Sequence, residues 1–145
     1  MNVWQQQEAL SRRLLRWAGL SIILGLVLSL GNKFWRGVGS QFLGWGVTNA
    51  LIAIFGQAAA RQRVADLENP GLVDVQAQEA EKLSRLLWIN AALDVLYMLG
   101  GRAVGQRDKG DGRMKGIGVG IILQGLFLLV FDIFHAREVD RERRA

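Results

Sequence analysis

WINAALDVLYMLGG, residues 88–101, has the composition of a membrane-spanning helix apart from two polar residues in its interior. Asp94 lies in the middle of the stretch, and Asn90 precedes it by about one helical turn. An aspartate at the bilayer centre costs roughly 2.5–3.5 kcal/mol on insertion scales, whereas each leucine returns only about 0.3–0.6 kcal/mol. The stretch therefore predicts a helix whose polar face is covered by neighbouring helices and not by lipid.

Three further apolar stretches of similar length accompany this one, and the charged residues gather between them. About 20 residues are needed for a helix to cross roughly 30 Å of hydrocarbon, and lipid offers no partner to an unpaired backbone. Half of the 145 residues are hydrophobic and none is cysteine, which excludes disulfides and thiol chemistry. The sequence predicts one all-α membrane domain over residues 1–145, with transmembrane helices at about 14–31, 37–57, 84–101 and 116–135 forming two tandem helical hairpins.

The distribution of Lys and Arg predicts an orientation. The N-terminal flank, the central connection and the C-terminal tail together hold more basic residues than the two remaining connections. Cytoplasmic connections carry such an excess, so both termini are expected in the cytoplasm. The basic flanks border the apolar stretches and form no single stripe, which favours contact with the headgroups of the lipid bilayer over binding of nucleic acid.

Two connections have distinct compositions. The central one, about 58–82, is expected to continue two helices into the cytoplasm as a helical hairpin that Asn69-Pro70-Gly71 breaks at its tip. The connection of residues 102–113 is rich in glycine and charge, and we expect it to be flexible.

The second and fourth apolar stretches resemble each other. GVGSQFLGWGVTNALIAIF from residue 37 and GIGVGIILQGLFLLVFDIF from residue 116 align at a constant offset of 79, which matches Gly39 with Gly118 and Gly46 with Gly125. Within each stretch the two glycines are two helical turns apart and share a face, where small residues allow close helix packing in lipid. We expect an internal repeat and a packing seam inside the bundle; a dimer face, and a chance alignment of glycine-rich text, are the alternatives.

NKFWRGVGSQFLGWGVTNALIAIFG, residues 32–56, resembles a signature of the form FWRGxGxQFxxWG. That signature is typical of a family of small bacterial four-helix integral membrane proteins of unknown function, and WINAALDVLYMLGG is similar to the same family. The resemblance implies a multi-pass protein of the bacterial inner membrane. It implies no activity.

Five polar residues are expected to be buried inside the bundle. Asn90, Asp94 and Tyr97 share one helical face, and counting from the flanking charges places Gln124 level with Asp94 and Asn49 level with Asn90. We predict one layer of Asp94 with Gln124, a second of Asn90 with Asn49, and a hydrogen bond from Tyr97 to Asp94. No basic residue lies at this depth, so Asp94 is expected to carry a proton much of the time. Asp94 is then a structural pin, a proton or cation site, or a contact to a partner subunit.

Asp132 and His135 are three residues apart near the cytoplasmic end of the last span. Pairing with a basic side chain is the ordinary interpretation, with the candidates Arg16, Arg85 and Arg137; a lipid-modifying active site is the alternative. His135 is the only histidine, so one chain cannot build a multi-histidine metal site, and we expect no metal and no other cofactor. No Ser–His, HExxH or Walker pattern is present, and the sequence predicts that the protein is not an enzyme.

Two functions follow from these expectations. The first is a structural or accessory subunit that assembles as a homo-oligomer or in a larger membrane complex, because no reactive constellation is present. The alternative is a homodimeric transporter of a small solute or ion that uses Asp94 as its proton or cation coupling site. The sequence identifies neither a substrate nor a partner.

Overall fold

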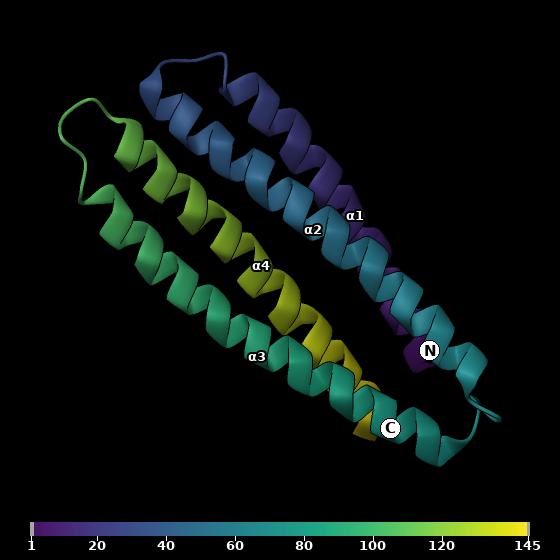
Figure 1. Ribbon diagram of the computed structural model, residues 1–145. Coiled ribbons are helices and arrows are strands. Elements are labelled where there is room, and N and C mark those ends of the chain that lie inside the picture. Colours follow the sequence, from purple (N-terminus) through teal and green to yellow (C-terminus); the bar gives the residue numbers. More distant parts are fainter. Residues whose placement is uncertain (1, 145) are drawn as a thin grey trace.

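The computed structural model describes residues 2–144, which form a bundle of four long helices (Figure 1). The helices are α1 (Val3–Leu28), α2 (Lys33–Asp66), α3 (Val73–Gly105) and α4 (Arg113–Arg144). α1 packs along α2 and α3 packs along α4, and the two hairpins meet mainly where α2 contacts α4. The prediction of an all-α fold is confirmed, and the helices of each predicted hairpin lie side by side.

Three of the described helices, α2, α3 and α4, are long and apolar enough to cross a membrane. α1 is not among them, because it contains Arg12, Arg13 and Arg16 and ends at Leu28. The uncharged part of α1 that follows Arg16 rises only about 18 Å at 1.5 Å per residue, short of the roughly 30 Å of a hydrocarbon core. Membrane-spanning helices are therefore supported for three of the four predicted spans, and the first span stays a prediction.

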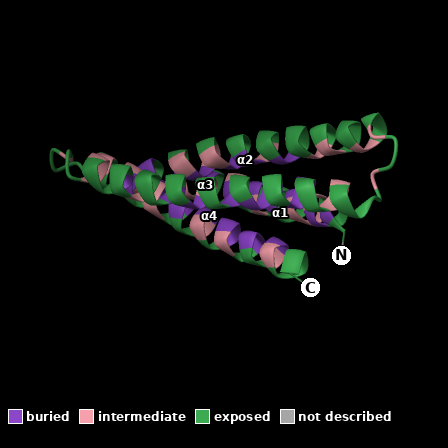
Figure 2. Cartoon of the chain, turned by 90° about the horizontal axis from the view of Figure 1, so that it is seen from below, coloured by how far each residue is buried: buried purple, intermediate pink, exposed green. Residues whose placement is uncertain are grey.

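The outer faces of the bundle are apolar. Large side chains that are more than half exposed occur on all four helices, among them Ile23, Phe55, Leu96 and Val130. Figure 2 shows the buried residues along the inward faces of the helices and the exposed residues outside. Water would penalise such a surface, whereas lipid tails are as apolar as leucine and accept it. The outer surface is therefore that of a membrane protein.

Glycines set the close packing within each hairpin. A Cβ atom added at Gly39 in α2 would come within 2.7 Å of the Gly25 carbonyl oxygen in α1. A Cβ atom added at Gly118 in α4 would likewise collide with the Gly101 carbonyl oxygen in α3. Only a residue without a side chain allows the two backbones to approach this closely.

The other matched glycines also lie at contacts inside the chain. Gly46 faces α1 and Gly125 faces α3, so they repeat two turns further on the contacts of the first pair. Gly37 and Gly116 join the hairpins, because a Cβ atom on Gly116 would collide with the Phe34 carbonyl oxygen of α2. From this crossing α2 and α4 diverge toward the end that carries both termini (Figure 2).

Polar contacts around the turn between α2 and α3 hold together the end of the bundle that carries both termini. The Pro70 carbonyl oxygen accepts hydrogen bonds from Trp4 Nε1 at 3.0 Å and from Gln76 Nε2 at 2.6 Å. Gln76 Oε1 in turn accepts from the backbone N–H of Val3 at 3.0 Å. The first turn of α1 is therefore fastened to the tip of the helical hairpin.

Hydrogen bonds to the Asp140 carboxylate hold α3 to α4 at the same end. Ser84 Oγ donates to Asp140 at 2.6 Å and Trp88 Nε1 donates at 3.1 Å. The bond from Ser84 is the main reason that the pKa of Asp140 lies below its usual range.

The connection between α3 and α4 is held in place, in contrast to the flexible loop that its glycines suggested. The Asp108 carboxylate accepts hydrogen bonds from four backbone N–H groups, those of Gly110, Gly112, Met114 and Lys115. Desolvation raises the pKa of Asp108, but these hydrogen bonds outweigh it and hold that pKa below its usual range. Lys33 adds an ion pair of 3.3 Å with Asp111, which ties the loop to the start of α2. The glycine-rich composition predicted a flexible loop because composition does not show how many backbone N–H groups will donate to one carboxylate.

Replacing Gly118 with alanine should destabilise the bundle. The added methyl group would meet the Gly101 carbonyl and, at 2.8 Å, the backbone of Gly105, and overpacking of this kind costs roughly 1–3 kcal/mol. Gly100→Ala is the matched control, because nothing lies within 4 Å of its added methyl group. Thermal unfolding in detergent should give a lower midpoint for Gly118→Ala and an unchanged or higher one for Gly100→Ala. Equal midpoints would contradict the packing role.

Replacing Asp108 with alanine should speed hydrogen exchange at the amides that its carboxylate binds, relative to a Lys109→Ala control. Because the pKa of Asp108 is lowered in the folded protein, the ionised side chain contributes stability at neutral pH. That contribution should be lost as the pH falls below about 4, where the carboxylate takes up a proton. Mass-spectrometric exchange of the peptide spanning residues 106–115 measures both effects; unchanged exchange in Asp108→Ala would refute the capping role.

Candidate functional site

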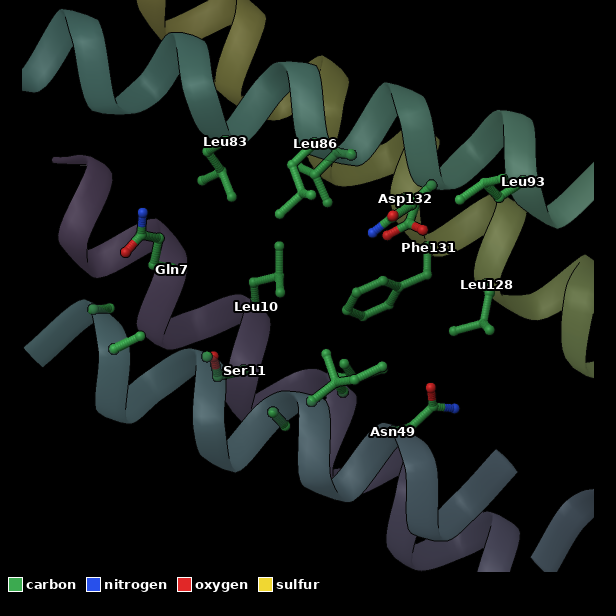
Figure 3. Close-up of a pocket in the computed structure, with 18 of the residues that line it drawn as sticks. Gln7, Leu10, Ser11, Asn49, Leu83, Leu86, Leu93, Leu128, Phe131 and Asp132 are labelled. Carbon is green, nitrogen blue, oxygen red and sulfur yellow. The ribbon is translucent and has the colours of Figure 1, made fainter. Parts of the chain in front are cut away.

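The divergence of the hairpins leaves a groove of about 440 Å³ between them, here called the inter-hairpin groove. The backbones of α2 and α3 do not approach each other in the described part of the chain, although side-chain contacts of Trp45 with Tyr97 and of Arg63 with Glu79 bridge them. The groove lies between these two helices and reaches α1 and α4 behind them. Its walls are mainly apolar and include Leu10, Leu14, Ala53, Leu83, Leu87, Leu128 and Phe131. Figure 3 shows Leu10 of α1 and Phe131 and Leu128 of α4 facing this space.

One end of the groove is charged and lies beyond the predicted spans. Glu79 Oε1 accepts from Lys82 Nζ at 2.8 Å and from Arg63 Nη2 at 3.2 Å. The hydrogen bond from Lys82 lowers the pKa of Glu79; desolvation opposes it and the bond from Arg63 adds to it, so that the pKa stays below its usual range. Two cations share one carboxylate, and this end therefore carries a net positive charge.

The other end of the groove contains a pair of carboxyl groups. Asp94 of α3 and Asp132 of α4 are 3% and 7% exposed, and their side chains are hydrogen-bonded to each other. Ionised carboxylates only accept hydrogen bonds, so this bond requires a proton on one of the two. Asp94 and Glu79 are separated by about 22 Å along α3 at 1.5 Å per residue. The carboxyl pair thus lies within the predicted spans and far from the charged end of the groove.

The predicted layer of Asp94 with Gln124 is wrong. Gln124 is fully buried, but its Oε1 accepts from Trp17 Nε1 at 3.2 Å and its Nε2 donates to Ser21 Oγ at 3.2 Å, both in α1. The depth argument ignored rotation about the helix axis. Gly125 of α4 packs against the backbone carbonyl of Asp94 and the side chain of Met98 in α3, and the preceding residue is turned about 100° away from it, toward α1.

The structure brings Asn49, Asn90, Asp94, Tyr97 and Asp132 to the wall of the same groove. No hydrogen bond joins Asn49 to Asn90 among the described residues, so the second predicted layer is a shared lining and not a bonded pair. The Nδ2 atom of Asn49 is buried and has no hydrogen-bond partner in residues 2–144, and the buried Oδ2 atom of Asp94 receives no hydrogen bond there from any group other than the Asp132 carboxyl. Figure 3 shows Asn49 and Asp132 approaching the groove from α2 and α4.

Tyr97 is not hydrogen-bonded to Asp94 in the described structure, contrary to the prediction. Its ring instead meets Trp45 of α2 edge-on, with centroids 5.1 Å apart. This is the one aromatic contact described between α2 and α3, and both rings line the groove. Trp45 lies about one helical turn from Asn49 in α2, and Tyr97 lies about one turn from Asp94 in α3. Two aromatic rings therefore lie close to the polar end of the groove.

A comparison with family models identifies the family of this chain. The model of the family of unknown function DUF6992 matches residues 13–133. The chain belongs to the DUF6992 family. The match covers Asp94, Asp132 and all four matched glycines. No curated protein and no solved structure matched the chain.

In this DUF6992 chain Asp132 and His135 have different partners. Arg13 Nη1 lies 2.9 Å from His135 Nε2, and because arginine can only donate, Nε2 is the acceptor. His135 Nδ1 then carries the proton and donates to the Phe131 carbonyl oxygen at 2.7 Å. The predicted pairing with Arg16, Arg85 or Arg137 is therefore replaced by pairing of His135 with Arg13 from α1.

Asp132 is the functional candidate whose partner the sequence analysis missed. Its place near the basic C-terminal tail suggested pairing with a basic side chain, whereas in the structure it is buried and faces Asp94 of α3. The signal was present in Ser84, Trp88 and Asp140: a hairpin register that pairs them also sets Asp132 about level with Asp94.

The DUF6992 chain offers a direct test of which buried amide is structural. Gln124→Leu would leave Trp17 Nε1 and Ser21 Oγ without their partner, and each orphaned group costs about 1–3 kcal/mol. Asn49→Leu removes a donor that has no partner and should leave the protein at least as stable. Thermal unfolding of both variants in detergent measures the difference; equal losses would show that Asn49 also holds the fold.

Proposed function

We propose that this DUF6992 protein is a proton-linked membrane transporter, with the Asp94–Asp132 pair as its proton-carrying site and the inter-hairpin groove as its solute site. One observation carries the proposal: two carboxyl groups that share a hydrogen bond are buried at the inner end of a groove. Ionisable residues within spanning helices are costly and mark ion or proton pathways by default. A structural pin needs only a neutral amide there.

The arrangement can exchange a proton for another positive charge. Removal of the shared proton leaves two negative charges side by side in a medium of low dielectric constant, which is unfavourable unless a cation replaces it. The pair can thus hold either a proton or a bound cation, and the state with neither is unfavourable. This is the requirement for coupling.

Access to the pair differs between the two ends of the bundle. The groove leads from the pair to the charged end at Arg63 and Glu79. Toward the short connections, backbone contacts at Gly37, Gly116 and Gly118 close the bundle. With both termini in the cytoplasm, as the basic flanks indicate, this conformation faces the cytoplasm, and transport requires a second one in which the closed end opens.

We propose a homodimer within a bacterial inner membrane as the working unit, because four helices enclose little space. The correspondence of glycines supports an origin of the two hairpins by internal repetition: Gly39 and Gly118 make equivalent contacts, as do Gly46 and Gly125. Two structurally equivalent halves that can rock against each other suit alternating access.

A structural or accessory subunit is the second candidate. Its supporting observation is the set of exposed glycines outside the groove, Gly19, Gly44 and Gly100, which have no atom within 4 Å of an added Cβ and could admit another helix closely. In that role the carboxyl pair would keep its proton at every accessible pH, and Asp94→Asn would be tolerated.

Infrared difference spectroscopy of the protein in lipid nanodiscs separates the two functions. The protonated carboxyl band of the wild type should change between about pH 4 and pH 9, because a coupling site must release its proton. Asp94→Asn and Asp132→Asn should each abolish that change. Asp140→Asn is the matched control, because Asp140 binds Ser84 and Trp88 outside the groove and its replacement should leave the band unchanged. A wild-type band that is constant over the whole range would eliminate the transport proposal.

A further inference from the structure

We infer that the solute of the inter-hairpin groove is an apolar organic cation, which binds beside Asp94 as the carboxyl pair releases its proton. The inference rests on the proposed function and names the substrate class of the same site. It is carried by the charge of the inner end, by two buried polar atoms, and by the aromatic and apolar walls.

Charge decides the sign of the solute. The ionisable residues at the inner end of the groove are Asp94, Asp132 and Tyr97. α2 contributes the neutral Asn49 there. The basic side chain that lines the groove, Arg63, lies at the other end and is already paired with Glu79. An anion would find no counter-charge beside the carboxyl pair, whereas a cation finds one.

The other titratable groups near the pair are committed elsewhere. His135 follows Asp132 by one turn of α4, but its ring is bonded to Arg13 and to the Phe131 carbonyl oxygen. α1 contributes Ser11 and Leu14 to the groove, neither of which titrates in the accessible range. The exchange of proton for cation therefore belongs to the two carboxyl groups.

Two buried atoms indicate where a solute would bond. Asp94 Oδ2 receives no hydrogen bond from any group in the described chain other than the Asp132 carboxyl, and it belongs to a side chain that is 3% exposed. Asn49 Nδ2 is an unpartnered donor on a side chain that is 1% exposed, on the opposite wall of the groove. Burial of such atoms is costly unless they are bonded. A cationic centre satisfies Asp94, and an oxygen atom on the same molecule would satisfy Asn49.

The walls determine the rest of the molecule. Trp45 and Tyr97 stand within one turn of Asn49 and Asp94, and the faces of aromatic rings attract cations. Beyond them the groove is lined by leucine, isoleucine and alanine, which favour an apolar body. Because the backbones of α2 and α3 stay apart in the described chain, such a molecule can enter sideways from the lipid, between the Trp45–Tyr97 contact and the Arg63–Glu79 ion pair.

The exchange balances in charge and atoms. With one proton the carboxyl pair has a net charge of −1; the arriving cation displaces that proton to water, and the charge of the occupied site is unchanged. No covalent bond other than the O–H bond is broken. Proton and cation compete for one site, so cation affinity should rise with pH, by about tenfold per pH unit where the pair is protonated.

An isosteric pair of ions tests the inference. Tetraphenylphosphonium and tetraphenylborate have nearly the same size and shape and opposite charges. Their binding to the wild-type protein in nanodiscs is measured by equilibrium dialysis against protein-free nanodiscs at several pH values, and proton release is followed with a pH dye. We expect saturable binding of the phosphonium alone, one proton released for each ion bound, and loss of both in Asp94→Asn and Asp132→Asn but not in Asp140→Asn.

Each outcome has a distinct meaning. If phosphonium binds no better than borate while the carboxyl band still titrates, the cation inference is overturned and the proposed proton site stands. If the band does not titrate, the proposed function itself fails. Saturable phosphonium binding that is independent of pH and survives Asp94→Asn would place the cation elsewhere and also overturn the inference.

Discussion

Close backbone contact at one end of the bundle is the constraint from which the rest of the structure follows. Gly37 and Gly116 bring α2 and α4 together near the short connections, where any side chain would separate them. Helices that touch at one end and run at an angle must part at the other, and the volume between them becomes the inter-hairpin groove. The position of the groove therefore follows from the position of the glycines, which allow close packing at one end of the bundle only.

The buried polar residues form two groups with different consequences. Gln124 and Asp140 each bind two donors or acceptors on a neighbouring helix, and they hold specific pairs of helices together. Asn49 and Asp94 retain unused hydrogen-bonding capacity and line the groove. Buried polar groups that have hydrogen-bond partners fix the helix register. Buried polar groups without such partners lower the stability of the fold and are typical of functional sites. The division separates residues that maintain the fold from residues available to a solute.

Much of the architecture could be predicted from the sequence, because hydrophobic runs and their breaks are local signals. The helix pairs, the burial of Asp94 and the importance of the glycine positions follow from composition and spacing. The partner of Asp94 does not, because it depends on the rotation of α4 about its axis: Gln124 has the right depth and the wrong direction. Asp132 was expected to pair with a basic side chain because it precedes the charged tail, and its position opposite Asp94 depends on the register of α4 against α3, which the sequence does not record.

The first helix and the third connection mark further limits of sequence analysis. The apolar stretch that begins in α1 extends past Leu28, but the helix ends there. The N-terminal half of α1 also carries arginines, of which Arg13 binds His135. Whether a run crosses a membrane depends on where the helix ends, which apolar composition does not record. In the connection around Asp108, several amides converge on one side chain, and that convergence exists only in three dimensions.

The hydrogen bonds around Pro70 give the groove a latch. The carbonyl of Pro70 and the side chain of Gln76 fasten Trp4 and Val3 to the tip of the α2–α3 hairpin, at the wide end of the groove. The width of the mouth is therefore governed by the first turn of α1, a part of the chain that precedes the family match. A fusion partner or affinity tag joined before α1 adjoins these hydrogen bonds, whereas one joined after α4 lies away from them.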